Sequence, residues 1–121
     1  MNKKRILVIE DDDMSRDGVA EVLTDEGYEV LTARDGVEGL ALIPTYHPEL
    51  VLTDLHLPNL NGWGVIERLK QTYPTLPVII FTSDIEIDAW REAQRLGVRG
   101  FVNKPLDLEE LIRHVKRVLP L

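Results

Sequence analysis

The sequence predicts an α/β fold, a doubly wound, five-stranded parallel sheet with helices on both of its faces. Five short apolar runs recur along the chain, and an amphipathic stretch of helical periodicity follows each of them. Continuous apolar runs are typical of parallel strands that are buried on both faces. Strict alternation of strand and helix implies right-handed crossovers. We expect the whole chain, residues 1–121, to form one domain.

The strands are predicted where short runs are mostly rich in Val, Ile, Leu and Thr. In chain order the runs are RILVI at 5–9, EVLTA at 29–33, LVLTD at 50–54, VIIFTS at 78–83 and GFVNK at 100–104. In open parallel sheets, ligands bind beyond the carboxyl ends of the strands, where the strand order reverses. We therefore expect the functional residues to cluster at that edge.

The first two helices are predicted from apolar spacing and from capping residues. One should span about 14–26, because Gly27 stands where a helix C-cap is expected. The next should start at about Gly36 with Asp35 as its N-cap, and Pro44 is expected to cut it short. The inward residues are Met14, Val19, Val22 and Leu23 in the first helix and Val37, Leu40 and Ala41 in the second.

The remaining three helices follow from the same signals. The third should span about 62–72 and the fourth about 86–96, where Gly97 stops it. Asp107 and Glu110 have the spacing of a capping box at the start of the fifth helix. The predicted core stripes are Val65, Ile66 and Leu69, then Ala89, Ala93 and Leu96, and finally Leu108, Leu111, Ile112, Val115 and Leu119.

The composition limits the classes of function. With 14 basic and 21 acidic residues the net charge is −7, which argues against direct binding to the phosphate backbone of nucleic acid. The absence of cysteine excludes disulfides, thiolate catalysis and cysteine metal sites. The apolar run after the basic start MNKKR is too short for a signal peptide, and no stretch is long enough to span a bilayer. We expect a cytoplasmic protein without membrane contact.

Chemically active side chains follow four of the five predicted strands. They are Glu10, Asp11 and Asp12, then Asp54, then Thr82 and Ser83, and finally Lys104. Carboxylates that share one edge repel one another, and a few oxygen ligands with open positions suit Mg²⁺ as their counter-ion. A carboxylate beside Mg²⁺ can attack phosphorus, while the lysine and a hydroxyl hold the phosphoryl oxygens. We assign Asp12 and the adjacent Asp13 to helix capping or to the surface.

Four segments, in this order and spacing, resemble those of one family. ILVIEDD, LVLTDLHLPNLNG, VIIFTSD and GFVNKPLD are similar to the acidic start, the phosphorylation loop, the fourth strand and the lysine–proline loop of a response-regulator receiver domain. This is the chemotaxis-regulator-like switch of two-component signal transduction. The resemblance covers essentially the whole chain and implies the flavodoxin-like strand order 2-1-3-4-5.

The resemblance also implies a role for each matching residue. Asp54 corresponds to the phospho-acceptor, which takes a phosphoryl group from the phosphohistidine of a sensor histidine kinase or a phosphotransfer protein. Glu10 and Asp11 would bind Mg²⁺ together with the Asp54 carboxylate and the His56 backbone carbonyl. Glu10 stands where the family more often has Asp, and its extra methylene favours a water-mediated contact to the metal. Lys104 would pair with the phosphoryl oxygens.

The switch and the output face follow from the same resemblance. Thr82 would hydrogen-bond to the phosphoryl group after transfer, and Phe101 would swing inward with it. The Lys104–Pro105 bond matches one that the family holds in cis. Trp90 lies off the predicted core stripe and should be partly exposed. It is a candidate contact on the surface of the fourth helix, fifth strand and fifth helix, where receivers dock a downstream target or form a homodimer.

Two other functions are compatible with an Asp that follows a strand. An aspartate-nucleophile phosphatase of the haloacid-dehalogenase type is one, but that class needs a second acid two residues on, where this chain has His56. A receiver-like adaptor that works without phosphorylation is the other, and the intact acidic site argues against it. We expect a phosphorylation-dependent switch with slow autodephosphorylation, not an enzyme with an external substrate.

Overall fold

The computed structural model describes residues 3–83 and 87–121, and its strands form one parallel sheet. The strand order is β2-β1-β3-β4-β5, as the resemblance implies. The strands are β1 Arg5–Ile9, β2 Glu29–Ala33, β3 Leu50–Thr53, β4 Val78–Thr82 and β5 Gly100–Asn103. Each lies within one of the predicted runs. The central strands β1, β3 and β4 are almost completely buried, because helices cover both faces of the sheet.

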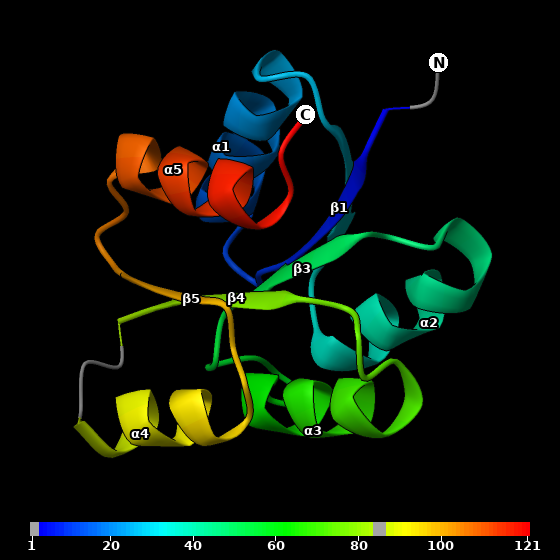
Figure 1. Cartoon of the computed structure of the whole chain (residues 1–121), viewed down its shortest axis with the longest axis vertical. Coiled ribbons are helices and arrows are strands. Elements are labelled where there is room, and N and C mark those ends of the chain that lie inside the picture. The colour runs from blue at the N-terminus through cyan, green and yellow to red at the C-terminus, as the bar shows by residue number, and fades with distance from the viewer. Residues whose placement is uncertain (1–2, 84–86) are drawn as a thin grey trace.

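Two layers of helices enclose the sheet (Figure 1), with α1 and α5 on one face and α2, α3 and α4 on the other. The helices are α1 Asp13–Asp25, α2 Gly36–Tyr46, α3 Gly62–Thr72, α4 Ile87–Arg95 and α5 Leu108–Val118. Residue 86, the predicted start of the fourth helix, lies outside the described residues. The doubly wound prediction is confirmed. Among the described residues, no helix is both long and apolar enough to cross a membrane.

Acidic and amide side chains begin the helices at the carboxyl edge of the sheet. Asp12, Asp35, Asn61 and Asp107 are N-caps, and each accepts a hydrogen bond from a backbone N–H of its own first turn. The capping predictions for Asp12, Asp35 and Asp107 are therefore confirmed. Gly27 adopts a φ of +109° just after the first helix, a left-handed conformation that favours glycine.

The second helix differs from its prediction in where it ends and in which of its residues are buried. Pro44 lies inside α2 and does not end it, and the helix ends only at Tyr46. A proline this close to the end removes a single N–H donor, and the final turn is closed by a hydrogen bond from His47 N to Ile43 O at 2.9 Å. The αL conformation of His47 then ends the helix.

The prediction of the buried side of α2 is confirmed at Leu40, which is partly buried against the core, and is wrong at Val37 and Ala41. Val37 is 56% exposed and Ala41 is exposed, whereas Gly36, Gly39 and Ile43 are buried. A Cβ at Gly39 would lie 2.4 Å from Ile9 Cδ1. At this position the backbone of α2 therefore packs directly against the Ile9 side chain of β1. An apolar count does not detect such a surface, because glycine contributes no apolar side chain.

Two further core predictions are wrong at helix starts. Met14 is 85% exposed and Leu108 is 40% exposed. Both lie in the first turn of a helix, where they line one hollow of about 370 Å³ beside Lys104. The other predicted stripe residues of α1, α3, α4 and α5 are buried or partly buried.

Candidate functional site

Three strands deliver the central side chains of the site. Glu10, Asp54 and Lys104 each follow the last residue of a strand, β1, β3 and β5 respectively. Ile9 and Thr53 are paired in the ladder, and Asp54 N donates to Ile9 O at 3.1 Å. On the other side Lys104 N donates to Thr82 O at 2.8 Å. The backbone of the sheet therefore fixes where these side chains start.

Lys104 lies between the two buried acids. Its ammonium donates to Asp54 Oδ2 at 2.7 Å and also pairs with Glu10 Oε1. The Glu10 side chain is completely buried and that of Asp54 is 7% exposed. The Nζ atom also lies 5.4 Å from the ring centre of Phe81. One cation thus compensates two carboxylates in a largely water-excluded setting.

Asp54 is held as an ionised group. Burial alone would raise its pKa, but hydrogen bonds from the Lys104 ammonium, the His56 N–H and Thr82 outweigh burial and lower the pKa below its ordinary value. Its Oδ1 accepts from Leu55 N at 2.6 Å and from His56 N at 3.2 Å. The carboxylate is therefore oriented from both sides, as a nucleophile needs to be.

Glu10 responds to the same neighbours in the opposite direction. Its burial is more costly than Lys104 can offset, and the negative charge of Asp54 adds to that cost, so the pKa of Glu10 is raised. Burial would lower the pKa of Lys104, yet its hydrogen bonds to the two acids raise it overall. The site therefore holds more negative charge than its one lysine neutralises.

Asp11 completes a possible metal centre. Carboxylate oxygens of Glu10, Asp11 and Asp54 all lie within 4.8 Å of one another. Asp11 is exposed, and its N–H donates to Glu10 Oε2 at 3.0 Å. Hard oxygen donors with one side open to solvent fit Mg²⁺, which prefers carboxylates and keeps several waters. These three residues were all predicted, and the structure brings them together.

The other predicted residues lie around this centre. Thr82 is fully buried at the end of β4. Phe101 on β5 is half-buried, and Trp90 on α4 is 49% exposed, as expected. Both aromatic side chains line one hollow of about 140 Å³ between α4 and β5. The peptide bond between Lys104 and Pro105 is cis, which agrees with the resemblance.

Arg16 is a residue of the site that was not predicted from the sequence, and it lies directly behind residues 10–13. Its side chain is buried, with only 8% of the residue exposed. It lies three residues before Val19 and seven before Leu23, on the buried stripe of α1. The sequence alone contains this signal. A charged residue at the spacing of an apolar stripe indicates a polar partner inside the protein.

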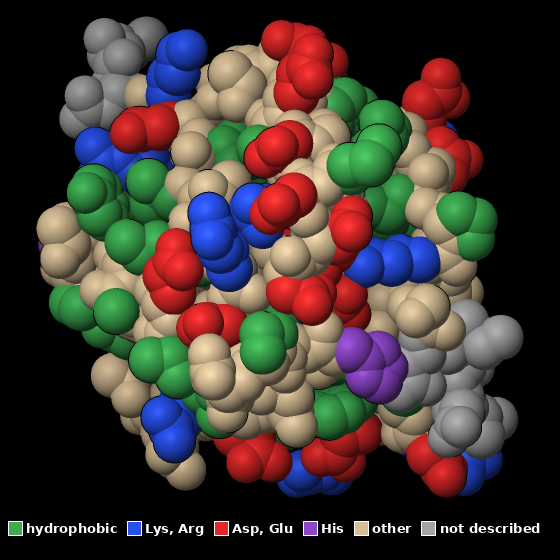
Figure 2. All heavy atoms as spheres, turned by 180° about the vertical axis from the view of Figure 1, so that it is seen from behind, with side chains coloured by type: hydrophobic (Ala, Val, Ile, Leu, Met, Phe, Trp, Pro, Cys, Tyr) green, Lys and Arg blue, Asp and Glu red, His purple; other side chains and the backbone are tan. Residues whose placement is uncertain are grey.

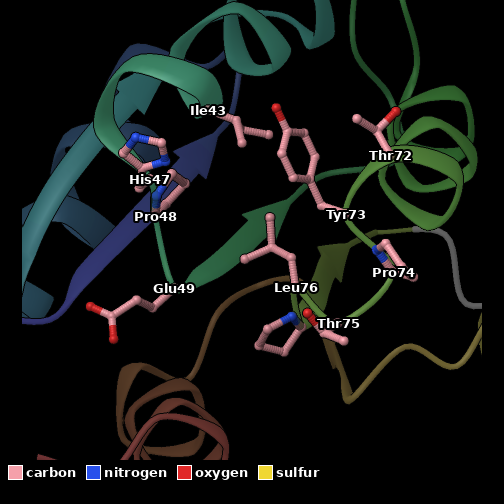
Figure 3. Close-up of a pocket in the computed structure, with 10 residues that line it drawn as sticks. Ile43, His47, Pro48, Glu49, Thr72, Tyr73, Pro74, Thr75 and Leu76 are labelled. Carbon is pink, nitrogen blue, oxygen red and sulfur yellow. The ribbon is translucent and has the colours of Figure 1, made fainter.

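Hollows lie at both edges of the sheet, and one of about 370 Å³ at the carboxyl edge is lined by Lys104 and Asp12. A pocket of about 440 Å³ lies at the amino ends of β3 and β4, between His47 and Pro48 after α2 and the segment after α3 that includes Tyr73 (Figure 3). Its walls combine prolines, Ile43, Leu76 and the Tyr73 ring with the polar residues His47, Glu49, Thr72 and Thr75. The cluster of carboxylates and lysine lies at the opposite edge, and we take that cluster as the functional site because reaction chemistry requires convergent charged groups.

The surface agrees with the acidic balance of the chain. On the side opposite to that of Figure 1, acidic side chains gather near the centre of the face, with basic side chains among them (Figure 2). This distribution accords with the net charge of −7. Such a surface favours the approach of cations over that of free anions.

These features define a class of protein, a doubly wound α/β domain with a carboxylate–lysine centre at the carboxyl edge of its sheet. Residues 6–116 match the family of the response regulator receiver domain. The chain therefore belongs to this family, whose members are the receiver domains of two-component response regulators.

Known relatives agree in sequence and in fold. The chain is 33% identical to sporulation initiation phosphotransferase F of Bacillus subtilis over 121 residues, covering 100% of this chain and 98% of that protein. It is 30% identical to the DNA-binding transcriptional regulator NtrC of Salmonella typhimurium, covering 98% of this chain but 25% of that protein. The non-phosphorylated HemR receiver domain of Leptospira biflexa superposes with a TM-score of 0.92 at 30% identity, covering 98% of this chain and 96% of that one.

Proposed function

We propose that residues 1–121 act as one receiver domain in which Asp54 accepts a phosphoryl group from a phosphohistidine and thereby switches the output face. The donor would be a sensor histidine kinase or a phosphotransfer protein. One observation carries the proposal: an ionised, 5% exposed Asp54 is held between backbone N–H groups and Lys104, within reach of two further acids. Membership of the receiver family supports the same function.

The residues of the site suit this transfer. An Asp54 oxygen would form a bond to phosphorus as the bond from phosphorus to the donor histidine nitrogen breaks, and the electron pair would stay on that nitrogen. Lys104 would shift from Asp54 to the phosphoryl oxygens, and the Thr82 hydroxyl would hold another oxygen. Glu10, Asp11, Asp54 and the His56 backbone carbonyl would hold Mg²⁺. When bound, the ion would screen the charge that accumulates on the phosphoryl group.

The output is proposed on the face of α4, β5 and α5. Thr82 closes β4, beside β5, and Phe101 lies on that neighbouring strand. A pull on Thr82 would therefore let Phe101 turn inward and alter the hollow that it shares with Trp90. We propose a downstream target or a second copy as the partner there. Direct nucleic-acid binding by this domain is not expected at a net charge of −7.

Intact mass spectrometry with acetyl phosphate tests the assignment of Asp54. The wild type should gain the mass of one phosphoryl group when Mg²⁺ is present and no such mass in EDTA. Asp54→Asn should gain none under either condition. Asp12→Asn is the matched control, because Asp12 lies in the same acidic run but caps α1 through Ser15 N at 2.8 Å. This variant should be modified like the wild type, and the added mass should disappear slowly by hydrolysis.

Failure of the wild type to be modified would count against the proposal. Modification that persists in Asp54→Asn would place the acceptor elsewhere. Partner binding can also be compared among Asp54→Asn, the unmodified wild type and the phosphorylated wild type. Equal affinity in all three would favour an adaptor that works without phosphorylation over the switch. Multiple turnovers on a generic phosphomonoester would instead favour a phosphatase.

A further inference from the structure

Arg16 is a buried cation at the back of the acidic loop, which consists of residues 10–13. Only 8% of the residue is exposed, although it lies in the second turn of a helix at the rim of the sheet. Nothing in the phosphoryl-transfer chemistry requires it. A charged group is buried in this way only where it has polar partners, so its partners indicate what it does.

The guanidinium bridges the two ends of the acidic loop. Its Nη1 donates to the Glu10 backbone carbonyl at 3.1 Å, and its Nη2 donates to Asp13 Oδ1 at 2.5 Å. The Arg16 N–H donates to the Asp12 carbonyl at 2.9 Å. The side chain of Arg16 thus contacts the first and last residues of the loop, and its backbone N–H contacts Asp12.

Asp11 is the remaining member of the loop, and it is an exposed member of the carboxylate cluster. Its neighbours on both sides are held, Glu10 through its carbonyl and Asp12 through its carbonyl and its capping bond. Fixing both neighbours restricts the backbone of Asp11, and with it the direction of the exposed carboxylate. A metal ligand that is oriented in advance binds with a smaller loss of conformational entropy.

We propose that Arg16 is a positioning residue that holds the loop of residues 10–13 in the form that receives Mg²⁺. The proposal rests on the proposed function, because it assumes that Glu10, Asp11 and Asp54 hold the ion. An arginine fits this role because its planar fork reaches two oxygens at once, whereas a lysine offers one point charge. Arg16 acts by holding the backbone of residues 10–13 and does not touch the phosphoryl group.

The positive charge of Arg16 should weaken Mg²⁺ binding, whereas its positioning of the loop should strengthen it. These opposite effects make the proposal testable. A permanent positive charge near the site repels a cation, so removing it should tighten Mg²⁺ binding if charge were the whole effect. If positioning dominates, removing the fork should weaken binding. Loss of a residue that orients a ligand commonly costs metal affinity about tenfold or more.

The test is calorimetric titration of the full chain with Mg²⁺. We expect Arg16→Gln and Arg16→Lys each to bind Mg²⁺ about tenfold more weakly than the wild type. The rate of modification by acetyl phosphate should approach the wild-type rate once Mg²⁺ is saturating. In the metal-free proteins, the amide resonance of Asp11 should show increased motion in both variants. A purely structural role would instead lower the melting temperature without changing Mg²⁺ affinity.

Arg5 provides the matched control at the amino end of β1. Its side chain also bridges a carboxylate and a backbone carbonyl, through Glu29 Oε2 at 2.9 Å and Tyr46 O at 2.8 Å. Arg5→Gln should leave Mg²⁺ affinity unchanged. If Arg16→Gln does not fold, Arg16→Lys, which keeps the charge, carries the test alone.

The outcomes separate the two proposals. A wild type that binds Mg²⁺ but is not modified by acetyl phosphate would overturn the proposed function and not the role of Arg16. A wild type that is modified normally, beside Arg16 variants that bind Mg²⁺ equally or more tightly, would overturn the role of Arg16 alone.

Discussion

At the carboxyl edge of the sheet the strands end in buried acids that share one lysine, whereas at the amino edge the loops enclose a pocket lined by both apolar and polar side chains. The first edge has perturbed pKa values with identifiable causes. The polar groups that line the amino-edge pocket do not converge in this way. Because the carboxyl edge also has a hollow, of about 370 Å³ beside Lys104, pocket volume does not distinguish the two edges, whereas charges held in a desolvated setting do.

The largest expected effect comes from removing the cation of the carboxyl edge. Lys104→Met should lower the free energy of unfolding in EDTA by about 3 kcal/mol, because two buried carboxylates lose their counter-charge. Phosphorylation by acetyl phosphate should also slow by at least about a hundredfold, since a preorganised charge is lost. Urea unfolding and intact mass measure the two effects.

Two variants control this prediction. Lys104→Arg keeps a positive charge and should recover most of the stability. Thr75→Ala changes an exposed residue of the amino-edge pocket and should alter neither quantity. Wild-type stability in Lys104→Met, or slower phosphorylation in Thr75→Ala, would contradict the distinction between a reactive carboxyl edge and an unreactive amino edge.

A smaller effect is expected from the backbone that supports Asp54. A Cβ at Gly62 would lie 2.2 Å from the Asp54 carbonyl oxygen and 2.7 Å from Leu55 Cα, both of which are backbone atoms. Gly62→Ala should therefore destabilise the fold by about 2 kcal/mol and displace the acceptor. The Mg²⁺-dependent modification rate should fall with it.

Gly18 is the matched glycine, because a Cβ there would meet nothing within 4 Å. Gly18→Ala lies inside α1 and should stabilise the protein by roughly 0.5 kcal/mol. Thermal unfolding compares the two variants. Equal effects at both positions would mean that the loop after β3 adapts freely and does not position Asp54.

Most of the fold could be predicted because complete burial leaves a strong sequence signal. β1, β3 and β4 are apolar throughout or nearly so, and their predicted and observed limits agree closely. The burial of Gly36 and Gly39 on α2 was not predicted, for the converse reason, since these residues contact the core without apolar side chains.

The members of the site could likewise be predicted, but their pairing could not. Parallel topology brings Glu10, Asp54 and Lys104 to one edge whatever their rotamers are. That Glu10 is fully buried and shares Lys104 with Asp54 depends on side-chain packing, which residue order does not reveal. Arg16 was missed because a single charge in an amphipathic helix is ordinarily a solvated residue.

The smallest predicted loss of stability belongs to the amino edge and tests whether that edge supports structure alone. Tyr28 precedes β2, is 1% exposed, and donates its hydroxyl to Leu119 O at 2.6 Å, joining the α1–β2 turn to the end of α5. Tyr28→Phe should cost about 1 kcal/mol of unfolding free energy, because the Leu119 carbonyl loses a buried donor. Mg²⁺ affinity and the phosphorylation rate should stay at wild-type values.

The alkaline pH dependence of stability should change in the same variant. Burial raises the pKa of the Tyr28 phenol above its ordinary value near 10, so the unfolded chain releases this proton at lower pH than the folded chain does. The stabilisation is complete below the unfolded pKa and is lost as pH rises toward the folded one. Tyr28→Phe should lack that loss, and urea unfolding at a series of pH values measures it. A fall in Mg²⁺ affinity in this variant would show that the two edges are coupled through the sheet, and the contrast between a reactive and a structural edge would then fail.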